Sequence, residues 1–512
     1  MRELVGADAE ALVRSQIEQH RGGIAKVLAP LDARSAVTAW LDTLRAVEEF
    51  INLPLCALDD DELEQSILDF RLDELDTRDL KKIQAALAAK FDVGVSNRFV
   101  LTVMQGMAIG TAFRQNGFFE AASGFQTIKH AIGYFQSRRR HLVALLYTLP
   151  SACRGMQPVQ RLDTLNLVLP VVEHSGLTLT GLYQHLMLAK VFPDYRLRAD
   201  AQGFSGSRQF ETLDAMFLEP ERASMLEMRT TADATVRDRL EEIDPRYLFS
   251  AAELRNDFRL IEAAYAEFDL SSTAFGSVAR FTTACLCFCK DNYRVELTAA
   301  QFEELAKESG IVDGVRRHLV HQGGDYVANL DEYAPFIAVD GVFIATVTLL
   351  SRFAYHWRSV CLNRVRRFQI RSGFILEASV KTALAKQGFA VADIKRIGGN
   401  EFDVIATLGD TVYNVQCKNN LVDLSRIETD PAKFARYNRQ LDRYYAQALR
   451  KEEAREQLLL LKLGLPKVKH VVVSRFPVAT DNPRILPFSR IEQFRSRFET
   501  LGGDSSVVLD QQ

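Results

Sequence analysis

Residues 401–418, EFDVIATLGDTVYNVQCK, contain two runs of strand-forming residues separated by Gly409 and Asp410. Gly and Asp are typical of the two-residue turns that join antiparallel strands. If these two residues form the turn, the pairing follows outward from it, so that Asp403 faces Gln416 and Glu401 faces Lys418. The stretch therefore predicts a β-hairpin whose register can be assigned residue by residue.

Side chains alternate between the faces of a strand, and directly opposed residues share a face. In this register one face carries the polar groups near the open end of the hairpin: Glu401, Asp403, Gln416 and Lys418. The other face carries the core-forming groups: Phe402, Val404, Ala406, Tyr413, Val415 and Cys417. A shift of one residue would destroy this separation, which supports the register.

The segments around the hairpin predict an α/β domain. A helix over 374–387 and a strand over 389–397 precede it, and a helix over 431–461 and a β-branched strand over 468–473 follow it. The predicted order is α-β-β-β-α-β. A hairpin within such an order requires a mixed sheet, with both parallel and antiparallel pairs.

The polar face of the hairpin suits phosphodiester hydrolysis. A carboxylate and an amide oxygen are ligands that Mg²⁺ accepts, and Mg²⁺ needs only one or two protein carboxylates. Lys418 is suited to orient the attacking water or to offset charge on the pentacovalent state. The alternative is a surface hairpin whose cross-strand ion pairs serve stability alone.

Asp403 followed by Gln416-Cys417-Lys418 resembles the signature of the PD-(D/E)XK, or restriction-endonuclease-like, nuclease superfamily. The predicted element order also resembles the core of that fold, and the match spans about residues 373 to 490. Gln416 stands where the commoner pattern has a second acidic residue, and the same QxK variant occurs in Mrr-like restriction enzymes. The resemblance implies a nuclease that requires Mg²⁺, or Mn²⁺ in its place, and cleaves DNA, with RNA not excluded.

The resemblance also implies a metal site. Glu377, on the helix before the first strand, occupies the place of the family's helical metal-site Glu. Glu377, Asp403 and Gln416 would then hold the metal, and together with Lys418 they would form the catalytic set. Without the resemblance, Glu377 is equally well explained as an ion-pair partner of Lys381 one turn away.

On the following helix, Gln440 and Tyr444 match the QxxxY motif of RecB-like members, which lines the nucleic-acid side of the site. These two residues are four apart and share a helical face. Arg439 and Arg443 are predicted to bind the substrate beside them, because Arg neutralises phosphates and Tyr stacks on unpaired bases. The alternative is an ordinary solvated helix face.

Charge is distributed unevenly along the chain. Residues 351–512 contain 27 Lys and Arg against 17 Asp and Glu, a net charge of +10, whereas residues 1–350 carry −13. The basic part favours a polyanion partner, although chance segregation of surface charge gives the same count. A stretch entering the α/β domain contributes several candidate phosphate-binding arginines: Arg352, Arg358, Arg364, Arg366, Arg367 and Arg371.

The first 350 residues are predicted to be mostly helical and carry no catalytic pattern of this kind. We expect a helical domain at 1–200, a second helical region at 208–350, a basic linker helix at 351–372 and the nuclease domain at 373–512, with the polar stretch 199–207 as a linker. The run Arg138-Arg-Arg-His141 is either a phosphate contact or a solvated helix face. His318, His321 and Asp325 are a weak candidate metal site, and a helix end that enters a turn is the alternative.

Composition excludes several classes of protein. The chain has 512 residues, of which 47% are hydrophobic and 25% charged, so it is expected to be globular and multidomain rather than collagen-like or disordered. Seven cysteines without a CxxC pair favour reduced thiols. With neither a signal peptide nor an apolar span evident, we expect a cytoplasmic protein without membrane association.

The biological setting is implied only by the resemblance. Anti-phage defence or restriction is the first expectation, and DNA repair or recombination is the alternative. A homo-oligomer or defence-system partner proteins would fit such a setting. Two rivals stay open: a non-catalytic nucleic-acid-binding module with a nuclease fold, and a helical region that senses a trigger and restrains the nuclease.

Overall fold

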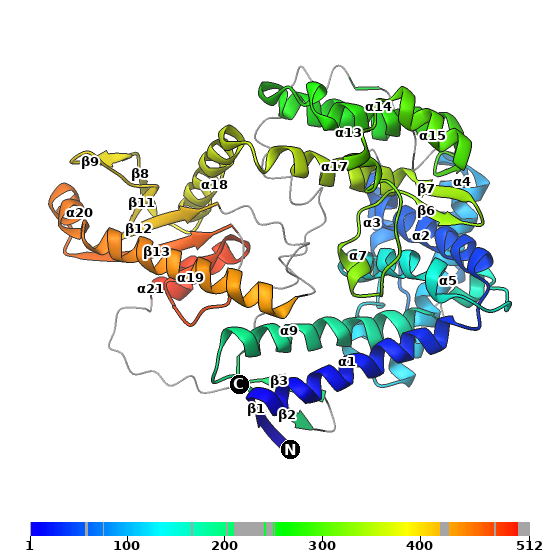
Figure 1. Ribbon diagram of the computed structural model, residues 1–512, viewed down its shortest axis with the longest axis horizontal. Coiled ribbons are helices and arrows are strands. Elements are labelled where there is room, and N and C mark those ends of the chain that lie inside the picture. Colours follow the sequence, from blue (N-terminus) through cyan, green and yellow to red (C-terminus); the bar gives the residue numbers. More distant parts are fainter. Residues whose placement is uncertain are drawn as a thin grey trace.

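The computed structural model describes residues 2–56, 60–74, 76–164, 167–200, 203–208, 240–241, 249, 251–419, 430–475 and 478–499. Helices predominate in these ranges, and a mixed five-stranded sheet lies in the C-terminal part. The predicted combination of a mostly helical N-terminal region and a C-terminal α/β part is therefore confirmed. Figure 1 shows the two parts side by side, with the sheet and its helices at the left.

The N-terminal region is built from helices of mixed length. They are α1 (Gly6–Leu28), α2 (Ala33–Cys56), α3 (Asp61–Leu68), α4 (Thr77–Lys90), α5 (Val93–Gln115), α6 (Phe119–Ser123), α7 (Ile128–Ala152), the short turn η1 (Arg161–Thr164), the π-helix η2 (Val168–Gly176) and α9 (Leu177–Val191). Side chains at Asp76, Asp92 and Thr127 cap the first turns of α4, α5 and α7 by accepting backbone N–H bonds.

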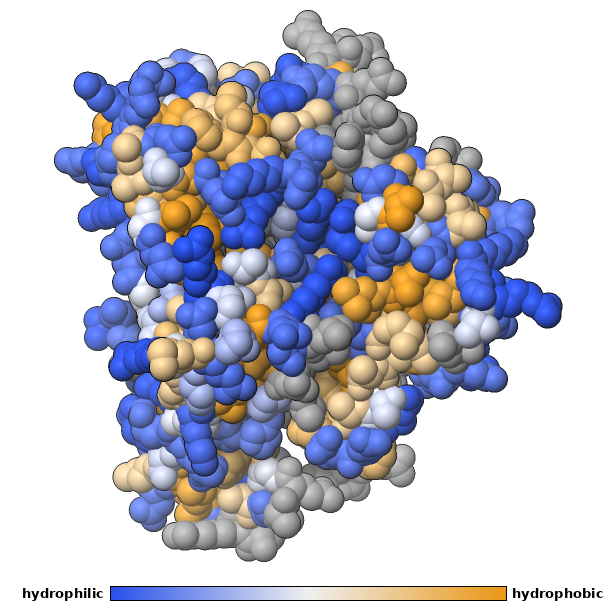
Figure 2. All heavy atoms as spheres, turned by 90° about the vertical axis from the view of Figure 1, so that its right-hand side faces the viewer, coloured by the Kyte–Doolittle hydropathy of each residue, from blue (hydrophilic) through white to orange (hydrophobic). Residues whose placement is uncertain are grey.

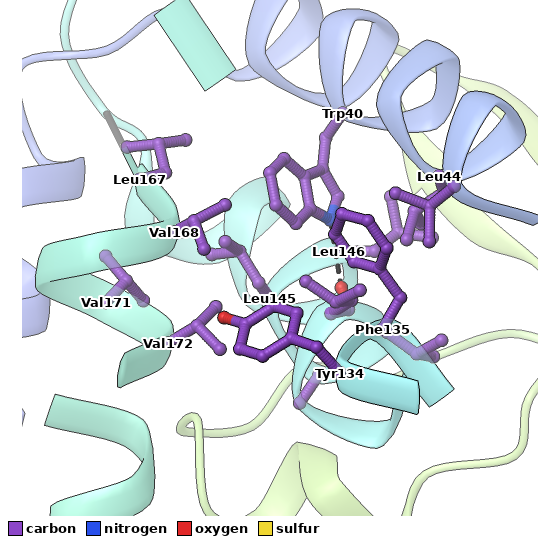
Figure 3. Close-up of a cluster of buried hydrophobic side chains, with 14 of the residues drawn as sticks. Trp40, Leu44, Tyr134, Phe135, Leu145, Leu146, Leu167, Val168, Val171 and Val172 are labelled. Atoms are coloured by element: carbon purple, nitrogen blue, oxygen red, sulfur yellow. Dashed lines mark hydrogen bonds between the residues drawn. The ribbon is translucent and has the colours of Figure 1, made fainter. Parts of the chain in front are cut away.

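Packing of α2 against α7 forms the centre of the N-terminal core. The apolar residues of α2 recur at three- and four-residue steps, and Trp40 points from it into the cluster drawn in Figure 3. Trp40 is fully buried, and its Nε1 donates a hydrogen bond to the carbonyl of Leu142 at 2.9 Å. This bond satisfies the only polar atom of a side chain that is otherwise held by apolar contacts.

The stretch expected to be a linker belongs to a small sheet instead. Strands β2 (Arg196–Asp200) and β3 (Gly203–Gly206) form an antiparallel hairpin, and β1 (Arg2–Val5) pairs with β2. Glycines and serines suggested an open loop, but Leu197 is fully buried and ties this hairpin to the N-terminal core. The described polar residues of this stretch therefore lie mostly in a strand pair rather than in an open loop.

Residues 251–362 combine helices with a four-stranded antiparallel sheet, which the prediction of a second helical region at 208–350 did not include. The helical elements are α13 (Ala251–Ala264), η3 (Ala266–Phe268), η4 (Leu270–Ser272), α14 (Ala274–Cys285), η5 (Leu286–Phe288), α15 (Ala299–Glu308), α16 (Asp313–Arg316), η6 (Ala328–Asp331) and α17 (Val347–Leu362). The strands are β4 (Cys289–Lys290), β5 (Arg294–Thr298), β6 (Ile337–Val339) and β7 (Val342–Thr346), in the order β4-β5-β7-β6. Periodicity missed these strands because they are two to five residues long.

The C-terminal part follows the predicted order with additions. Its elements are α18 (Arg366–Lys386), β8 (Ala390–Ala392), β9 (Arg396–Ile397), β10 (Asn400–Glu401), β11 (Val404–Leu408), β12 (Thr411–Lys418), α19 (Pro431–Glu453), α20 (Glu456–Leu463), β13 (Lys467–Ser474), β14 (Ile485–Pro487), η8 (Phe488–Gln493) and α21 (Phe494–Glu499). The strand order is β14-β13-β12-β11-β8; β12 and β13 are parallel, whereas β11 is antiparallel to both of its neighbours. The mixed sheet is confirmed.

Helices cover both faces of this sheet. On one face Leu376 and Val380 of α18 and Phe494 of α21 pack against Val404 and Val415. On the other face α19 and α20 cover Phe402, which precedes β11, and a second set of strand residues: Ile405, Val412, Val472 and Ile485. The result is a helix–sheet–helix arrangement in which the open end of the β11–β12 hairpin lies between helices.

Two helices attach the C-terminal part to the rest of the chain. Phe368, in the first turn of α18, packs in the core of residues 251–362, while the later residues of the same helix pack on the sheet. Phe434 of α19 is 2% exposed and belongs to the N-terminal core, where α19 packs against α9. On the side face drawn in Figure 2, hydrophilic side chains predominate and hydrophobic ones occur in patches between them.

Candidate functional site

The register predicted for the hairpin is confirmed where its strands pair. Val404 lies opposite Val415 and Leu408 opposite Thr411, around a turn in which Gly409 has φ of +59°. A positive φ suits Gly, which lacks a Cβ. The turn residues therefore determined the pairing, as the sequence indicated.

Pairing between β11 and β12 ends at Val404, and two predictions beyond that point are wrong. Glu401 does not face Lys418; it lies in β10, opposite Arg396 of β9, and forms an ion pair with that residue. Phe402 packs with Ile405 beneath α20, on the opposite face of the sheet from Val404. The chain bends at Asp403, so the strict alternation assumed for 401–404 does not hold.

At this bend, where backbone pairing between β11 and β12 has ended, the side chain of Asp403 contacts β12. Its Oδ2 accepts a hydrogen bond from the backbone N–H of Cys417 at 2.8 Å. Burial raises the pKa of Asp403, while the nearby Lys418 ammonium and the Cys417 N–H act in the opposite direction. Asp403 is thus fixed by the backbone of the strand that carries the QxK residues.

Glu377 reaches the same place from α18. Burial and, after it, the negative charge of Asp403 raise the pKa of Glu377 to about 7; Lys381, Lys395 and Lys418 act against this rise. Asp403, from a segment far from α18 in the sequence, therefore lies close enough to disfavour ionisation of Glu377. The charge of Lys381 lowers the pKa of Glu377, but burial and the charge of Asp403 outweigh it.

Gln416 and Lys418 lie on one face of β12, as predicted from strand alternation. The Lys418 Nζ donates to Gln416 Oε1 at 3.1 Å, and Gln416 is 7% exposed. The same ammonium lies 5.8 Å from the centre of the Tyr444 ring on α19. Lys418 is thereby held between the strand and the helix, at the edge of the two-carboxylate cluster.

The predicted substrate-binding residues share one exposed face of α19. Arg439, Gln440, Arg443 and Tyr444 line a groove of about 590 Å³ together with Arg436 and Gln447. The opposite face of this helix is buried through Phe434, Ala435, Asn438, Leu441, Tyr445 and Leu449. Amphipathic spacing therefore explains both the packing of α19 and the orientation of its basic residues.

A buried polar network behind the site was not anticipated from the sequence. Asn414 Nδ2 donates to Glu452 Oε2 at 3.0 Å and lies 3.1 Å from His470 Nδ1. Arg455 Nη1 connects Glu452 to the carbonyl of Glu401, at 3.2 and 3.3 Å. The signal that could have found it is Asn414, a polar residue within an apolar strand and 0% exposed.

A second group of contacts, also missed, ties α18 to the end of β12. Arg475, at the end of β13, donates through Nη1 to Ser372 Oγ at 2.6 Å and to Asn419 Oδ1 at 3.2 Å. Asn419 follows Lys418 directly, and Ser372 lies on α18 five residues before Glu377. These bonds fix the helix that carries Glu377 against the strand that carries Lys418.

The arginines expected to contact nucleic acid on entry to the domain are largely structural. Arg352 and Arg358 are each 3% exposed; Arg352 donates to the carbonyl of Glu332, and Arg358 donates to the Tyr265 hydroxyl at 2.7 Å. Arg371 forms an ion pair with Glu267 at 2.8 Å. Folding of α17 and α18 onto α13 turned these side chains inward, whereas Arg364 and Arg366 are exposed.

The basic run in α7 is neither a phosphate contact nor a solvated face. Each of its four side chains has a partner within the protein: Arg138 with Glu173, Arg139 with Glu48, Arg140 with Asp331, and His141 with the Tyr326 hydroxyl. The candidate site at His318 and His321 is also wrong, because His318 packs on Trp357 while His321 and Asp325 pair with Glu332 and Arg21. In the described ranges, no group of three or more His, Cys, Asp and Glu side chains is arranged to hold a metal ion.

Comparison of this chain with protein-family models, with curated proteins and with solved structures found no match. A search of the described residues for a helix long and apolar enough to cross a membrane also found none.

Proposed function

We propose that this chain is a metal-dependent nuclease that hydrolyses phosphodiester bonds of DNA. The observation that carries the proposal is the convergence of Glu377 and Asp403 beside Lys418. These residues come from α18, the β10–β11 connection and β12. The charge of Asp403 raises the pKa of Glu377, and the Lys418 ammonium lowers the pKa of both carboxyl groups. Such a combination of perturbed carboxylates and an adjacent cation is typical of a functional site rather than of a surface hairpin.

The donor set fits Mg²⁺ or Mn²⁺. Two carboxylates that repel each other gain from a cation between them, and hard oxygen ligands suit these ions, which retain several waters. Gln416 would support the ion through its amide oxygen, although that oxygen already accepts a hydrogen bond from Lys418. When bound, such a cation polarises a phosphoryl oxygen and lowers the pKa of water.

The protein's own residues then have distinct roles. Lys418, held by Gln416 and facing the Tyr444 ring, would orient the attacking water or offset charge that develops on the phosphate. The exposed arginines of α19 would bind phosphates beside the site, which gives an affinity that does not depend on base sequence. Anti-phage defence or restriction is the setting that we propose, on the resemblance alone.

One observation favours a second candidate function, a nucleic-acid-binding module without catalysis. Gln416 brings no negative charge, and its only side-chain oxygen is engaged by Lys418. A site with two carboxylates binds a cation less strongly than one with three. The basic face of α19 would then be the functional surface by itself.

Cleavage of plasmid and single-stranded DNA with Mg²⁺, with Mn²⁺ and with EDTA tests the proposal. Asp403→Asn and Lys418→Met should each lower the metal-dependent rate by about a hundredfold or more, because each removes a charge from the reacting centre. The matched controls are Asp410→Asn and Lys467→Met, an exposed ion pair at 2.7 Å at the turn end of the same hairpin.

The controls should cleave like the wild type. Equal activity in all five proteins would show that the assigned residues are not the catalytic site. Binding of DNA without cleavage under either metal would replace the nuclease with the non-catalytic module.

A further inference from the structure

An exposed aromatic side chain stands beside the two-carboxylate cluster on α18. Phe374 is 62% exposed and Ile370, one turn earlier, is 51% exposed. Phe374 and Glu377 are three residues apart and therefore lie on the same face of the helix. Single exposed apolar residues are common on proteins, and Phe374 differs from them in its surroundings.

A second exposed ring flanks the cluster from α19. Tyr444 is 48% exposed and lies next to the Lys418 ammonium, 5.8 Å from its ring centre. The two helices cover opposite faces of the sheet, as Figure 1 shows for α18 and α19. An aromatic side chain thus borders the Glu377–Asp403–Lys418 cluster on each side.

The two borders differ in charge. On α19 the groove residues Arg436, Arg439 and Arg443 accompany Tyr444. On α18 the residues from Ile370 to Leu376 add no unpaired charge beside the cluster, because Arg371 is paired with Glu267 and Ser372 is fully buried. The exposed Arg366 lies about two turns before Phe374, and Lys381 lies about two turns after it. One side of the site therefore suits phosphates, and the other suits an apolar, planar group.

Duplex DNA presents phosphates on both of its edges and keeps its bases stacked inside, so an exposed Phe ring gains little from it. An unpaired strand has phosphates along one side and base faces along the other, and bases stack on aromatic side chains regardless of sequence. This division matches the basic and apolar sides of the cluster.

We propose that the site takes an unpaired stretch of a DNA strand, with its phosphates along α19 and a base stacked on Phe374. This inference rests on the proposed nuclease function and specifies the form of its substrate. Phe374 would be a specificity-determining residue, because it touches the nucleotide and not the metal ligands.

Fluorescence anisotropy of the full chain in EDTA, with one oligonucleotide presented single-stranded or as a blunt duplex, measures binding apart from cleavage. Phe374→Ala should weaken binding of the single strand by at least about fivefold and leave duplex binding unchanged. Phe374→Trp should retain the affinity, and Phe374→Leu should not, because Leu is apolar but has no ring. The matched control is Phe119→Ala, another exposed Phe, 72% exposed on α6 in the N-terminal region.

Cleavage with Mg²⁺ is measured on the same substrates to separate the two proposals. Strand binding that depends on Phe374 without cleavage would remove the nuclease assignment and keep the strand-binding one. Cleavage that treats both substrates alike and is unaffected by Phe374→Ala would keep the nuclease and overturn this inference. Stacking would also be overturned if Phe374→Ala weakened binding of single strand and duplex equally. The same holds if Phe374→Leu and Phe374→Trp weakened binding of the single strand equally.

Discussion

Glu377 and Asp403 are the pair of residues on which the candidate site depends. Burial and the charge of Asp403 raise the pKa of Glu377 to about 7, above the ordinary 4.5 of a Glu side chain. The folded protein therefore holds this proton more tightly than the unfolded chain does. Stability from this group is fully present below about pH 4.5 and is lost as the pH rises through about 7.

We predict that Glu377→Gln removes this loss. In EDTA, the Tm of Glu377→Gln should equal that of the wild type near pH 4 and exceed it at pH 8, with the gap opening between about pH 4.5 and 7. Thermal unfolding at fixed ionic strength measures it. Glu401→Gln is the control, since its ion pair with Arg396 lowers the pKa of Glu401 and should give no gain at high pH. A Tm difference independent of pH would show that Glu377 is not perturbed in this way.

At the scale of secondary-structure elements, α19 joins the site to its basic surface. One face of the helix is buried in the core, and the arginines on the other face line the groove. The same amphipathic pattern that folds the helix therefore sets its phosphate-facing side.

The arginines of α19 should determine how DNA binding responds to salt. Arg439→Gln and Arg443→Gln should each weaken binding at low salt and reduce the slope of log affinity against log salt by about 0.7 per lost phosphate contact on a single strand. Anisotropy titrations at several salt concentrations measure both quantities. Arg495→Gln, on α21 and paired with Glu499 at 3.1 Å, should leave the slope unchanged. If Arg439→Gln, Arg443→Gln and Arg495→Gln all keep the wild-type slope of log affinity against log salt, the DNA binds elsewhere on the protein.

At the scale of the whole molecule, the C-terminal part is built into the rest of the chain. Phe368 of α18 packs in the core of residues 251–362, and Phe434 of α19 packs in the N-terminal core. A fragment starting at residue 351 would cut α17 and expose both rings. The idea that the helical region restrains the nuclease is therefore best tested with point substitutions in the full chain.

Phe434→Ala should loosen the connection between the two parts. Loss of this buried ring should lower the free energy of unfolding by about 3 to 5 kcal/mol. Hydrogen exchange should rise in both α19 and α9, because the ring lies where these helices meet. Phe498→Ala removes a ring that is 1% exposed and packs in the C-terminal core, so its effect on exchange should be confined to that core. Exchange that rises in α19 alone after Phe434→Ala would contradict the coupling.

The sequence by itself determined the local features of this protein. The Gly409-Asp410 turn fixed the pairing of β11 with β12, strand alternation placed Gln416 and Lys418 on one face, and helical spacing placed Gln440 with Tyr444. These features depend on neighbours within a few residues, for which the periods of strands and helices suffice.

Tertiary structure alone decided which groups meet. It brought Glu377 to Asp403 and built the contacts of Arg475 and Asn414, and it turned Arg352 and Arg358 into the interior. It also bent the chain at Asp403, which took Glu401 out of the site. Charge and burial depend on distances in space between residues far apart along the chain, and residue type and periodicity do not contain those distances.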